Sequence, residues 1–205
     1  MPRLHHPGGM AGAADAAGIA MELDLALDAD GPWAPEDPTS LAELQTWQTT
    51  LMDWIQTIGA DPALPCPAVV RQADELCLGL RFTDDATITA LNSTWRQRNQ
   101  ATDVLSFAAL EDAPALPDVS SVELGDIVIS LDTARRQASE QQHSLNRELR
   151  WLVSHGLLHL LGWDHPDETS LTAMLQLQEQ LLDGGGNVQA SELHPVDTTV
   201  DGNAR

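Results

Sequence analysis

The stretch His155-Gly156-Leu157-Leu158-His159-Leu160-Leu161-Gly162-Trp163-Asp164-His165 decides how this chain is organised. Leucines recur through it every three or four residues and predict a helix, and histidines four residues apart lie on one face of a helix. Gly162 predicts the end of that helix, because glycine adopts a left-handed conformation without steric penalty. The chain can then turn and bring His165 back beside His155 and His159.

Three neutral imidazoles with an open fourth position are the ligands of a catalytic zinc ion, so the spacing predicts one Zn²⁺ per chain, on the helix and the loop after it. Zinc proteases with the pattern H-E-x-x-H-x-x-G-x-x-H have their histidines and glycine at the same offsets. Their general base is the Glu after the first histidine, and Gly156 stands there in this chain. Nickel, copper and iron also bind imidazole, so the spacing leaves the identity of the metal open.

The chain of 205 residues has 31 acidic and 10 basic residues, and its formal charge is −21. A protein this acidic repels nucleic acid at long range, which counts against nucleic-acid binding unless arginines gather in one cleft. Cys66 and Cys77 lack metal-ligand spacing, so we expect free thiols in a cytoplasmic protein. No apolar run reaches the length of a membrane span, so no membrane partner is expected.

Periodicity in the rest of the chain predicts an α+β (mixed α/β) domain over residues 21–183. Apolar alternation and short apolar runs predict four strands, at 21–27, 76–82, 104–107 and 127–129. Helical periodicity predicts about five helices, at 41–58, 84–95, 131–142, 145–161 and 167–182. We expect these elements to form a small, mostly parallel four-stranded sheet packed with helices. Residues 1–20 and 184–205 are predicted to be disordered tails.

Details of two helices follow from the same patterns. The first is expected to begin after a cap at Thr39 or Ser40 and to turn apolar residues, Leu44 among them, toward the core. The next helix is expected to bury one apolar stripe, formed by Ile88, Leu91 and Trp95.

Four blocks of sequence carry a family resemblance: Leu91–Arg96 (LNSTWR), Thr102–Phe107 (TDVLSF), Leu124–Ile129 (LGDIVI) and the histidine stretch. Together they resemble the YbeY family of bacterial metal-dependent endoribonucleases, and the resemblance covers roughly residues 21–183. This chain has Trp95 and Trp163 where the family usually has Tyr, and Ala101 and Ala108 where it usually has Pro. None of these differences removes a proposed metal ligand.

The resemblance implies a single-strand-specific, metal-dependent endoribonuclease that matures the 3′ end of small-subunit ribosomal RNA and takes part in ribosome quality control. It implies that His155, His159 and His165 bind zinc, and that Arg96 and His155 are the catalytic residues. The implied partners are small-subunit ribosomal RNA and the ribosome or a ribosomal protein, with no role for DNA.

Several other residues have both a functional and an ordinary structural interpretation. Asp164 can orient a ligand or act on water, or it can shape the turn after the helix. Arg98 can assist Arg96 or be a surface arginine. Ser106 and Asp103 can line the pocket or serve as capping and turn residues.

A basic track for RNA is a further possibility, formed by Arg135, Arg136, Arg147 and Arg150. Solvated or salt-bridged arginine is the default on an exposed helix. His143 and His194 are expected to be surface residues.

Two other functions remain open at this stage. A zinc hydrolase of a peptide or amide bond would use the same histidine spacing, and Gly156 in place of the Glu speaks against it. A non-catalytic ribosome-assembly factor would suit the charge of −21, because such a protein works through partners rather than through free RNA.

Overall fold

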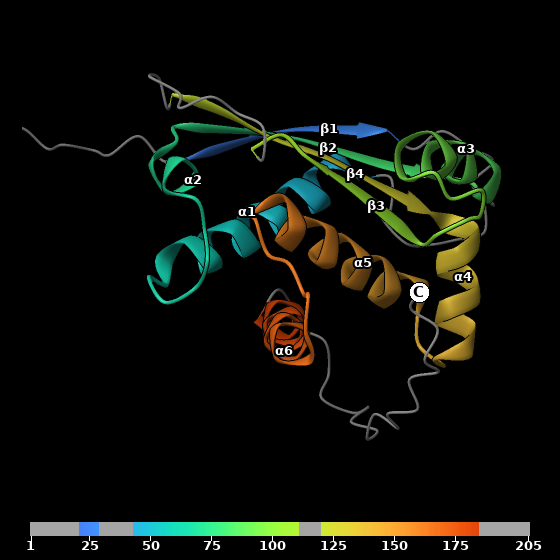
Figure 1. The fold of residues 1–205 in the computed structure, drawn as a ribbon. Helices are drawn as coiled ribbons and strands as arrows, with labels where there is room; N and C mark the ends of the chain where they lie inside the picture. The colour runs from blue at the N-terminus through green and yellow to red at the C-terminus, as the bar shows by residue number, and fades with distance from the viewer. Residues whose placement is uncertain (1–20, 29–42, 111–119, 185–205) are drawn as a thin grey trace, which may run out of the picture.

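The computed structural model describes residues 21–28, 43–110 and 120–184. Within these ranges it has four strands and six helices (Figure 1): β1 Glu22–Asp28, α1 Leu44–Ala60, α2 Ala68–Gln72, β2 Glu75–Thr83, α3 Asp85–Arg96, β3 Val104–Ala108, β4 Ser121–Ser130, α4 Leu131–Glu140, α5 Leu145–Leu160 and α6 Glu168–Gly184. The predicted α+β class is confirmed. The short helix α2 was missed, because five residues between prolines and a strand are too few to show a helical period.

The strands form one sheet in the order β1-β2-β4-β3. β1, β2 and β4 are parallel and β3 is antiparallel to β4, so the predicted mostly parallel sheet is confirmed. Strand β4 is longer than the predicted 127–129, because Val122 and Leu124 are also buried on it. Gly125 has a φ of +114°, and a Cβ there would collide with the carbonyl oxygen of Phe107, so glycine is required where β3 and β4 pair.

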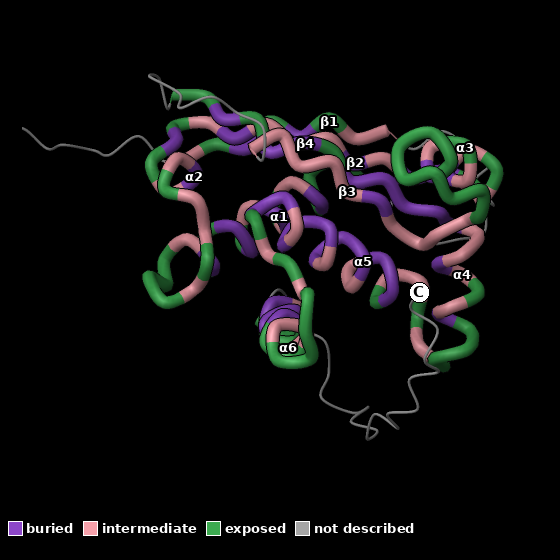
Figure 2. Tube along the Cα trace, in the orientation of Figure 1, coloured by how far each residue is buried: buried purple, intermediate pink, exposed green. Residues whose placement is uncertain are grey.

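Helices α1 and α5 pack on one face of the sheet, and α6 lies beneath α5 (Figure 1). Buried residues run along the strands and along the sides of these helices that face one another (Figure 2). Helix α3 packs on the other face, where Ile88 meets Leu105 and Val128. No helix in the described part of the chain is both long and apolar enough to cross a bilayer.

Three details of the sequence prediction were wrong. Leu44 is the first residue of α1 and is 46% exposed rather than inward. On α3 only Ile88 of the expected stripe is fully buried, while Leu91 is half-buried and Trp95 is 66% exposed. The stripe fails because Ile88 is where α3 packs on β3 and β4, while the ring of Trp95, at the far end of the helix, contacts Phe107 and stays mostly exposed.

Some predictions fall outside the described residues. The caps proposed at Thr39 and Ser40 lie there, and α1 has Glu43 at its N-cap with no side-chain cap bond. The predicted tails lie there too, except for Gly184. The tail was predicted to begin at this residue, but in the structure it is the last residue of α6. Cys66 and Cys77 are free, as predicted.

Gly156 lets α5 lie unusually close to the sheet. A Cβ at this position would come within 2.8 Å of Cγ2 of Ile127 on β4. We therefore expect Gly156→Ala to lower the free energy of unfolding by about 1–3 kcal/mol, as overpacked core positions do. Urea denaturation measures this loss.

Gly59 in α1 is the matched control, because a Cβ there meets no atom within 4 Å. Gly59→Ala is expected to raise the free energy of unfolding by about 0.5–1 kcal/mol, since alanine favours a helix over glycine. An equal gain at Gly156 would contradict the close approach to Ile127.

Candidate metal centre

Helix α5 carries the first two histidines, and its two ends are set by local sequence. The hydroxyl of Ser144 caps the start by accepting a hydrogen bond from the backbone N–H of Arg147. At the other end Gly162 has a φ of +85°. Its N–H donates to the carbonyl of His159 (3.0 Å), and the N–H of Trp163 donates to that of Leu158 (2.9 Å). This paired bonding is a Schellman motif, and it turns the chain back on the helix as predicted.

The turn brings the three histidines together. The ring centroids of His155 and His159 are 4.7 Å apart. The ring centroid of His165 lies 5.6 Å from that of His155 and 5.3 Å from that of His159. One ring nitrogen from each histidine lies within 4.8 Å of the other two. In the described part of the chain, this is the one group of three or more metal-ligating side chains that meets this condition.

Gln178 of α6 fixes the orientation of His155. Its Nε2 donates to the carbonyl of Trp151 (3.1 Å) and to the hydroxyl of Ser154 (3.2 Å), and that hydroxyl in turn donates to Trp151. The amide oxygen of this fully buried side chain therefore faces Nδ1 of His155, at 3.2 Å. Because an amide oxygen only accepts, we assign the hydrogen of the His155 ring to Nδ1.

The backbone fixes the orientation of His159 in the same way. Its Nδ1 lies 2.9 Å from the carbonyl oxygen of Trp163, which again only accepts, so Nδ1 carries the hydrogen. The Nε2 atoms of His155 and His159 are then lone-pair acceptors, and they face each other at 3.1 Å. Two acceptors this close repel each other unless a cation lies between or beside them, so the donor set fits a metal ion.

The pKa values of the same two rings favour their neutral form. Burial lowers the pKa of His155 below its ordinary value, against the opposing effect of the Gln178 hydrogen bond. Burial also lowers the pKa of His159, against the hydrogen bond from its ring to Trp163. Neutral imidazole is the form that binds a metal, so both rings are in their ligand form near neutral pH.

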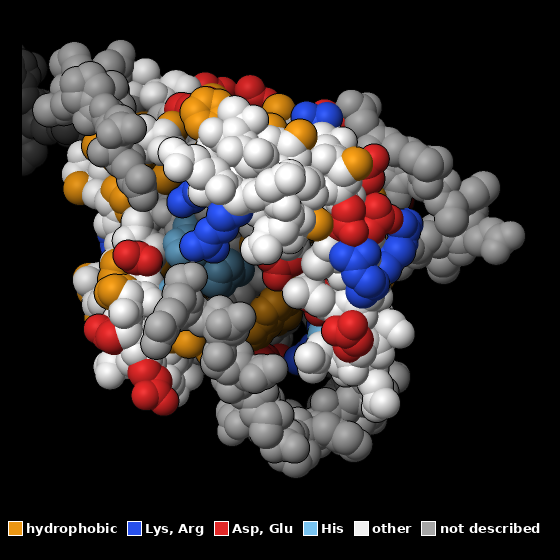
Figure 3. All heavy atoms as spheres, turned by 45° about the vertical axis from the view of Figure 1, so that its right-hand side comes forward, with side chains coloured by type: hydrophobic (Ala, Val, Ile, Leu, Met, Phe, Trp, Pro, Cys, Tyr) orange, Lys and Arg blue, Asp and Glu red, His pale blue; other side chains and the backbone are white. Residues whose placement is uncertain are grey.

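Arg96 lies beside this centre. It is the last residue of α3, and its Nη2 donates to the carbonyl of Ser106 on β3 (3.3 Å). Strand β3 packs in turn against α5, the helix that carries His155 and His159. Figure 3 shows histidine side chains in a recess of the surface with arginine beside them. The centre therefore combines three histidines that could hold a metal ion with a cation suited to phosphate oxygens.

Three of the other candidates have structural partners. The carboxylate of Asp164 accepts from the N–H of His165 and so shapes the metal-binding turn. The carboxylate of Asp103 accepts from Val104 N–H and from Gln137, which is a loop role. Ser106 contributes its carbonyl rather than its hydroxyl.

The four arginines of the suggested basic track have partners within the fold. Arg135 pairs with an Asp, Arg136 with Asp85 at 2.8 Å and Arg147 with a Glu, while Arg150 lies over the ring of Trp54. Each guanidinium group of the suggested track is therefore engaged in its own local contact, which agrees with the ordinary structural interpretation of these arginines. 

His143 and His194 had both been expected on the surface. His143 was placed wrongly, because its side chain is only 21% exposed and is bonded to the buried Glu148. His194 lies outside the described residues.

Gln178 was missed at the sequence level, although a signal was present. It lies four residues after Met174 and three before Leu181, both of them buried on the inward side of α6. A polar residue within an apolar stripe marks a buried hydrogen bond. The carbonyl of Trp163 leaves no such signal, since any residue has one.

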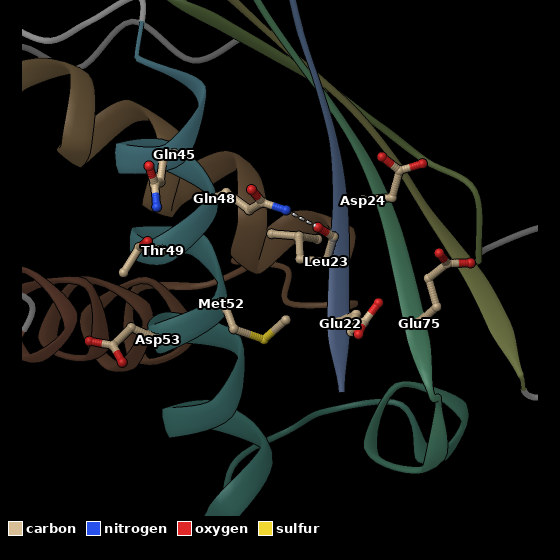
Figure 4. Close-up of a pocket in the computed structure, with 9 residues that line it drawn as sticks. All are labelled: Glu22, Leu23, Asp24, Gln45, Gln48, Thr49, Met52, Asp53 and Glu75. Carbon is tan, nitrogen blue, oxygen red and sulfur yellow. Dashed lines mark hydrogen bonds between the residues drawn. The ribbon is translucent and has the colours of Figure 1, made fainter. Parts of the chain in front are cut away.

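A pocket of about 600 Å³ lies elsewhere, between β1 and α1 (Figure 4). Gln48 donates to the carbonyl of Leu23 across it, and acidic side chains line it, namely Glu22, Asp24, Asp53 and Glu75. None of its lining residues belongs to the histidine centre, and its acidic lining does not suit a polyanion.

Comparison with known proteins gives the following matches. A family model described as Endoribonuclease YbeY matches residues 42–186. A protein of Parasynechococcus marenigrum (strain WH8102) named Endoribonuclease YbeY is 84% identical over 184 residues, which are 90% of this chain and 100% of that protein. Proteins of the same name from Synechococcus sp. strains CC9902 and CC9605 are 57% and 61% identical, over 86% and 80% of this chain and 99% and 100% of theirs. A Thermotoga maritima protein solved in solution overlaps with a TM-score of 0.48 at 19% identity, over 78% of this chain and 87% of that one.

Proposed function

The chain belongs to the YbeY family of endoribonucleases, and on that basis we propose that it hydrolyses phosphodiester bonds of single-stranded ribosomal RNA. The proposed reaction is the late maturation of the 3′ end of small-subunit ribosomal RNA, together with ribosome quality control. We assign the activity to a domain spanning residues 21–183 of a cytoplasmic protein. The observation that carries the proposal is the meeting of the three histidines beside β3, the strand that packs against α5 and to which Arg96 is hydrogen-bonded.

The proposed metal ligands are His155, His159 and His165, with Zn²⁺ as the ion. The fit rests on the hydrogen-bonded Nδ1 atoms and the facing Nε2 atoms of the first two rings. An ion bound there supplies a Lewis acid that lowers the pKa of a water molecule and polarises the phosphodiester.

The proposed catalytic residues are Arg96 and His155. The planar fork of the guanidinium matches two phosphate oxygens, so Arg96 binds the phosphodiester and stabilises the charge that develops on it. The bond to the Ser106 carbonyl ties the guanidinium to β3, which supports this role. His155 acts through its Nε2, which Gln178 directs toward the same point.

The net charge bears on how RNA reaches this site. A charge of −21 repels free RNA at long range. We propose that the ribosome or a ribosomal protein presents the RNA, so that short-range contacts at the centre are enough.

The alternative of a peptide or amide hydrolase is disfavoured by packing. Gly156 stands where the proteases have their general base, and Ile127 of β4 leaves no room for a larger side chain there. A non-catalytic ribosome-assembly factor remains the second candidate and is an outcome of the test below.

The proposal is tested with zinc-loaded protein and a 3′ precursor fragment of small-subunit ribosomal RNA. We expect cleavage of the single strand and none of the same fragment annealed to its complement. Absence of cleavage on the ribosome-bound precursor as well, with association to the small subunit retained, would favour the assembly factor. Turnover of a peptide substrate with RNA inert would favour the other hydrolase.

Gln178 provides a prediction about metal affinity. Gln178→Met keeps the length of the side chain but removes the acceptor for His155 Nδ1–H, together with the bonds to Trp151 and Ser154, so His155 is free to turn or to change tautomer. We expect zinc affinity to fall about 10- to 100-fold, as it does when a ligand loses its hydrogen-bond partner. Isothermal titration with zinc measures the change.

Two controls separate this effect from a loss of folding. Gln176 is exposed on the same helix, so Gln176→Met should leave zinc affinity unchanged. Gln178→Glu keeps an acceptor oxygen facing His155 and, when its carboxyl is protonated, a donor toward the Trp151 carbonyl, so it should restore part of the affinity. Equal zinc affinity in Gln178→Met and the unchanged protein would disprove the orienting role.

A further inference from the structure

Trp95 is an exposed aromatic side chain held in a defined position. It is 66% exposed, and Leu44 is the other large hydrophobic residue that is exposed in the described ranges. The indole and the ring of Phe107 on β3 form a T-shaped pair, with ring centroids 5.9 Å apart and an angle of 70° between the rings. Phe107 therefore steadies the indole, and most of the Trp95 side chain remains open to solvent.

The backbone that carries this ring is fixed as well. Gln97 takes a left-handed conformation (φ 58°) and closes α3 by donating its N–H to the carbonyl of Asn92. The side chain of Asn92 is buried and donates to the carbonyl of Gln100 at 2.9 Å. The last turn of α3 and the loop after it are thus tied together, which keeps the indole in place without a ligand.

The position of Trp95 relates it to the metal centre. Trp95 and Arg96 are consecutive on α3 and contact consecutive residues of β3: the indole contacts Phe107, and the guanidinium donates to Ser106. Strand β3 also packs against α5, which carries His155 and His159. A polynucleotide whose phosphate is bound by Arg96 therefore brings a neighbouring base to the indole.

We propose that Trp95, steadied by Phe107, is a stacking platform for one unpaired nucleobase next to the cleaved phosphodiester. This inference rests on the proposed function. Every base has a π-face, so stacking on an aromatic ring binds single strands without regard to sequence. It requires no positive charge, which suits a protein with a charge of −21, and a base already paired and stacked in a duplex cannot use it.

The test compares Trp95→Leu, which keeps an apolar side chain, with Trp95→Tyr, which keeps an aromatic one. On a single-stranded fragment, loss of one stacked base is expected to raise KM about 5- to 100-fold in Trp95→Leu and to change kcat much less. Trp95→Tyr should restore most of the affinity. Leu44→Ala, the other exposed apolar residue, should leave KM unchanged.

A second substrate removes the base instead of the ring. A series of substrates is made, each with one abasic nucleotide beside the cleaved bond. For one substrate of the series, the KM of the unchanged protein and that of Trp95→Leu should be equal. An unchanged KM in Trp95→Leu, or the same loss on every abasic substrate, would overturn the platform.

Binding of an oligonucleotide probe in which a P–CH₂ bond replaces the cleaved P–O bond, so that hydrolysis cannot cut it, separates this inference from the proposed function. If zinc-loaded protein fails to cleave RNA but binds this probe more tightly than Trp95→Leu does, the platform stands and the nuclease assignment falls. If cleavage is normal and both proteins bind the probe equally, the platform is wrong and the nuclease assignment stands. Zinc content and melting temperature, measured on each variant, verify that the centre and the fold are intact.

Discussion

His159→Ala is expected to remove both zinc binding and RNA cleavage. His159 lies between the other two histidines along the chain, and its Nε2 faces that of His155 at 3.1 Å. Loss of a hydrogen-bond partner of a ligand costs about 10- to 100-fold in metal affinity, and loss of the ligand itself should exceed that range. Isothermal titration and metal analysis measure zinc binding, and cleavage of the single-stranded precursor fragment should fall to background.

His143→Gln is the matched control. His143 is bonded to the buried Glu148 and lies outside the triad, and a glutamine at this position keeps a donor for that carboxylate. This variant should bind zinc and cleave RNA as the unchanged protein does. Cleavage that persists in a zinc-free His159→Ala preparation would exclude a catalytic role for the metal. If His143→Gln, Arg96→Ala and the unchanged protein all cut equally as well, the cleavage comes from a contaminating ribonuclease.

Arg96→Ala is expected to lower kcat/KM about 10²- to 10³-fold while zinc binding is retained. The magnitude is that of losing one donor aimed at charge that develops in a transition state. Arg96→Lys should recover little of the activity, because an ammonium lacks the planar fork that matches two phosphate oxygens. Single-turnover cleavage and zinc titration on the same preparations measure the two quantities.

Arg98 provides the comparison for this charge, since it is exposed two residues later and its backbone N–H donates to the carbonyl of Asn92. Arg98→Ala removes the same formal charge and should reduce cleavage much less than Arg96→Ala. Equal losses in the two variants would mean that the region contributes only a general attraction for RNA.

The metal-binding stretch was predictable because its geometry is local. The spacing of His155 and His159 places both on one face of α5, and Gly162 ends the helix through bonds within a few residues. The alternation of apolar residues predicted β1 and β2 for a similar reason, since each strand buries one face.

Features that depend on distant parts of the chain were harder to predict. Gln178 lies 23 residues from His155, and nothing near either residue indicates that they meet. The exposure of Trp95 depends on where α3 packs on the sheet, which its own periodicity does not contain. Arg96 was named from resemblance, and its contact with Ser106 appears only when α3 and β3 lie side by side.

The close contact between Gly156 and Ile127 also limits how this protein can evolve. A lineage that gained a glutamate at position 156 would also have to replace Ile127 with a smaller residue, because the isoleucine fills the space that the new side chain needs. Each change alone is a loss: a cavity in the core in one order, a clash in the other. Proteins with only one of the two substitutions therefore form a fitness valley between this centre and one that carries a proteolytic base. Selection acting on the stability of the fold therefore keeps the two chemistries apart.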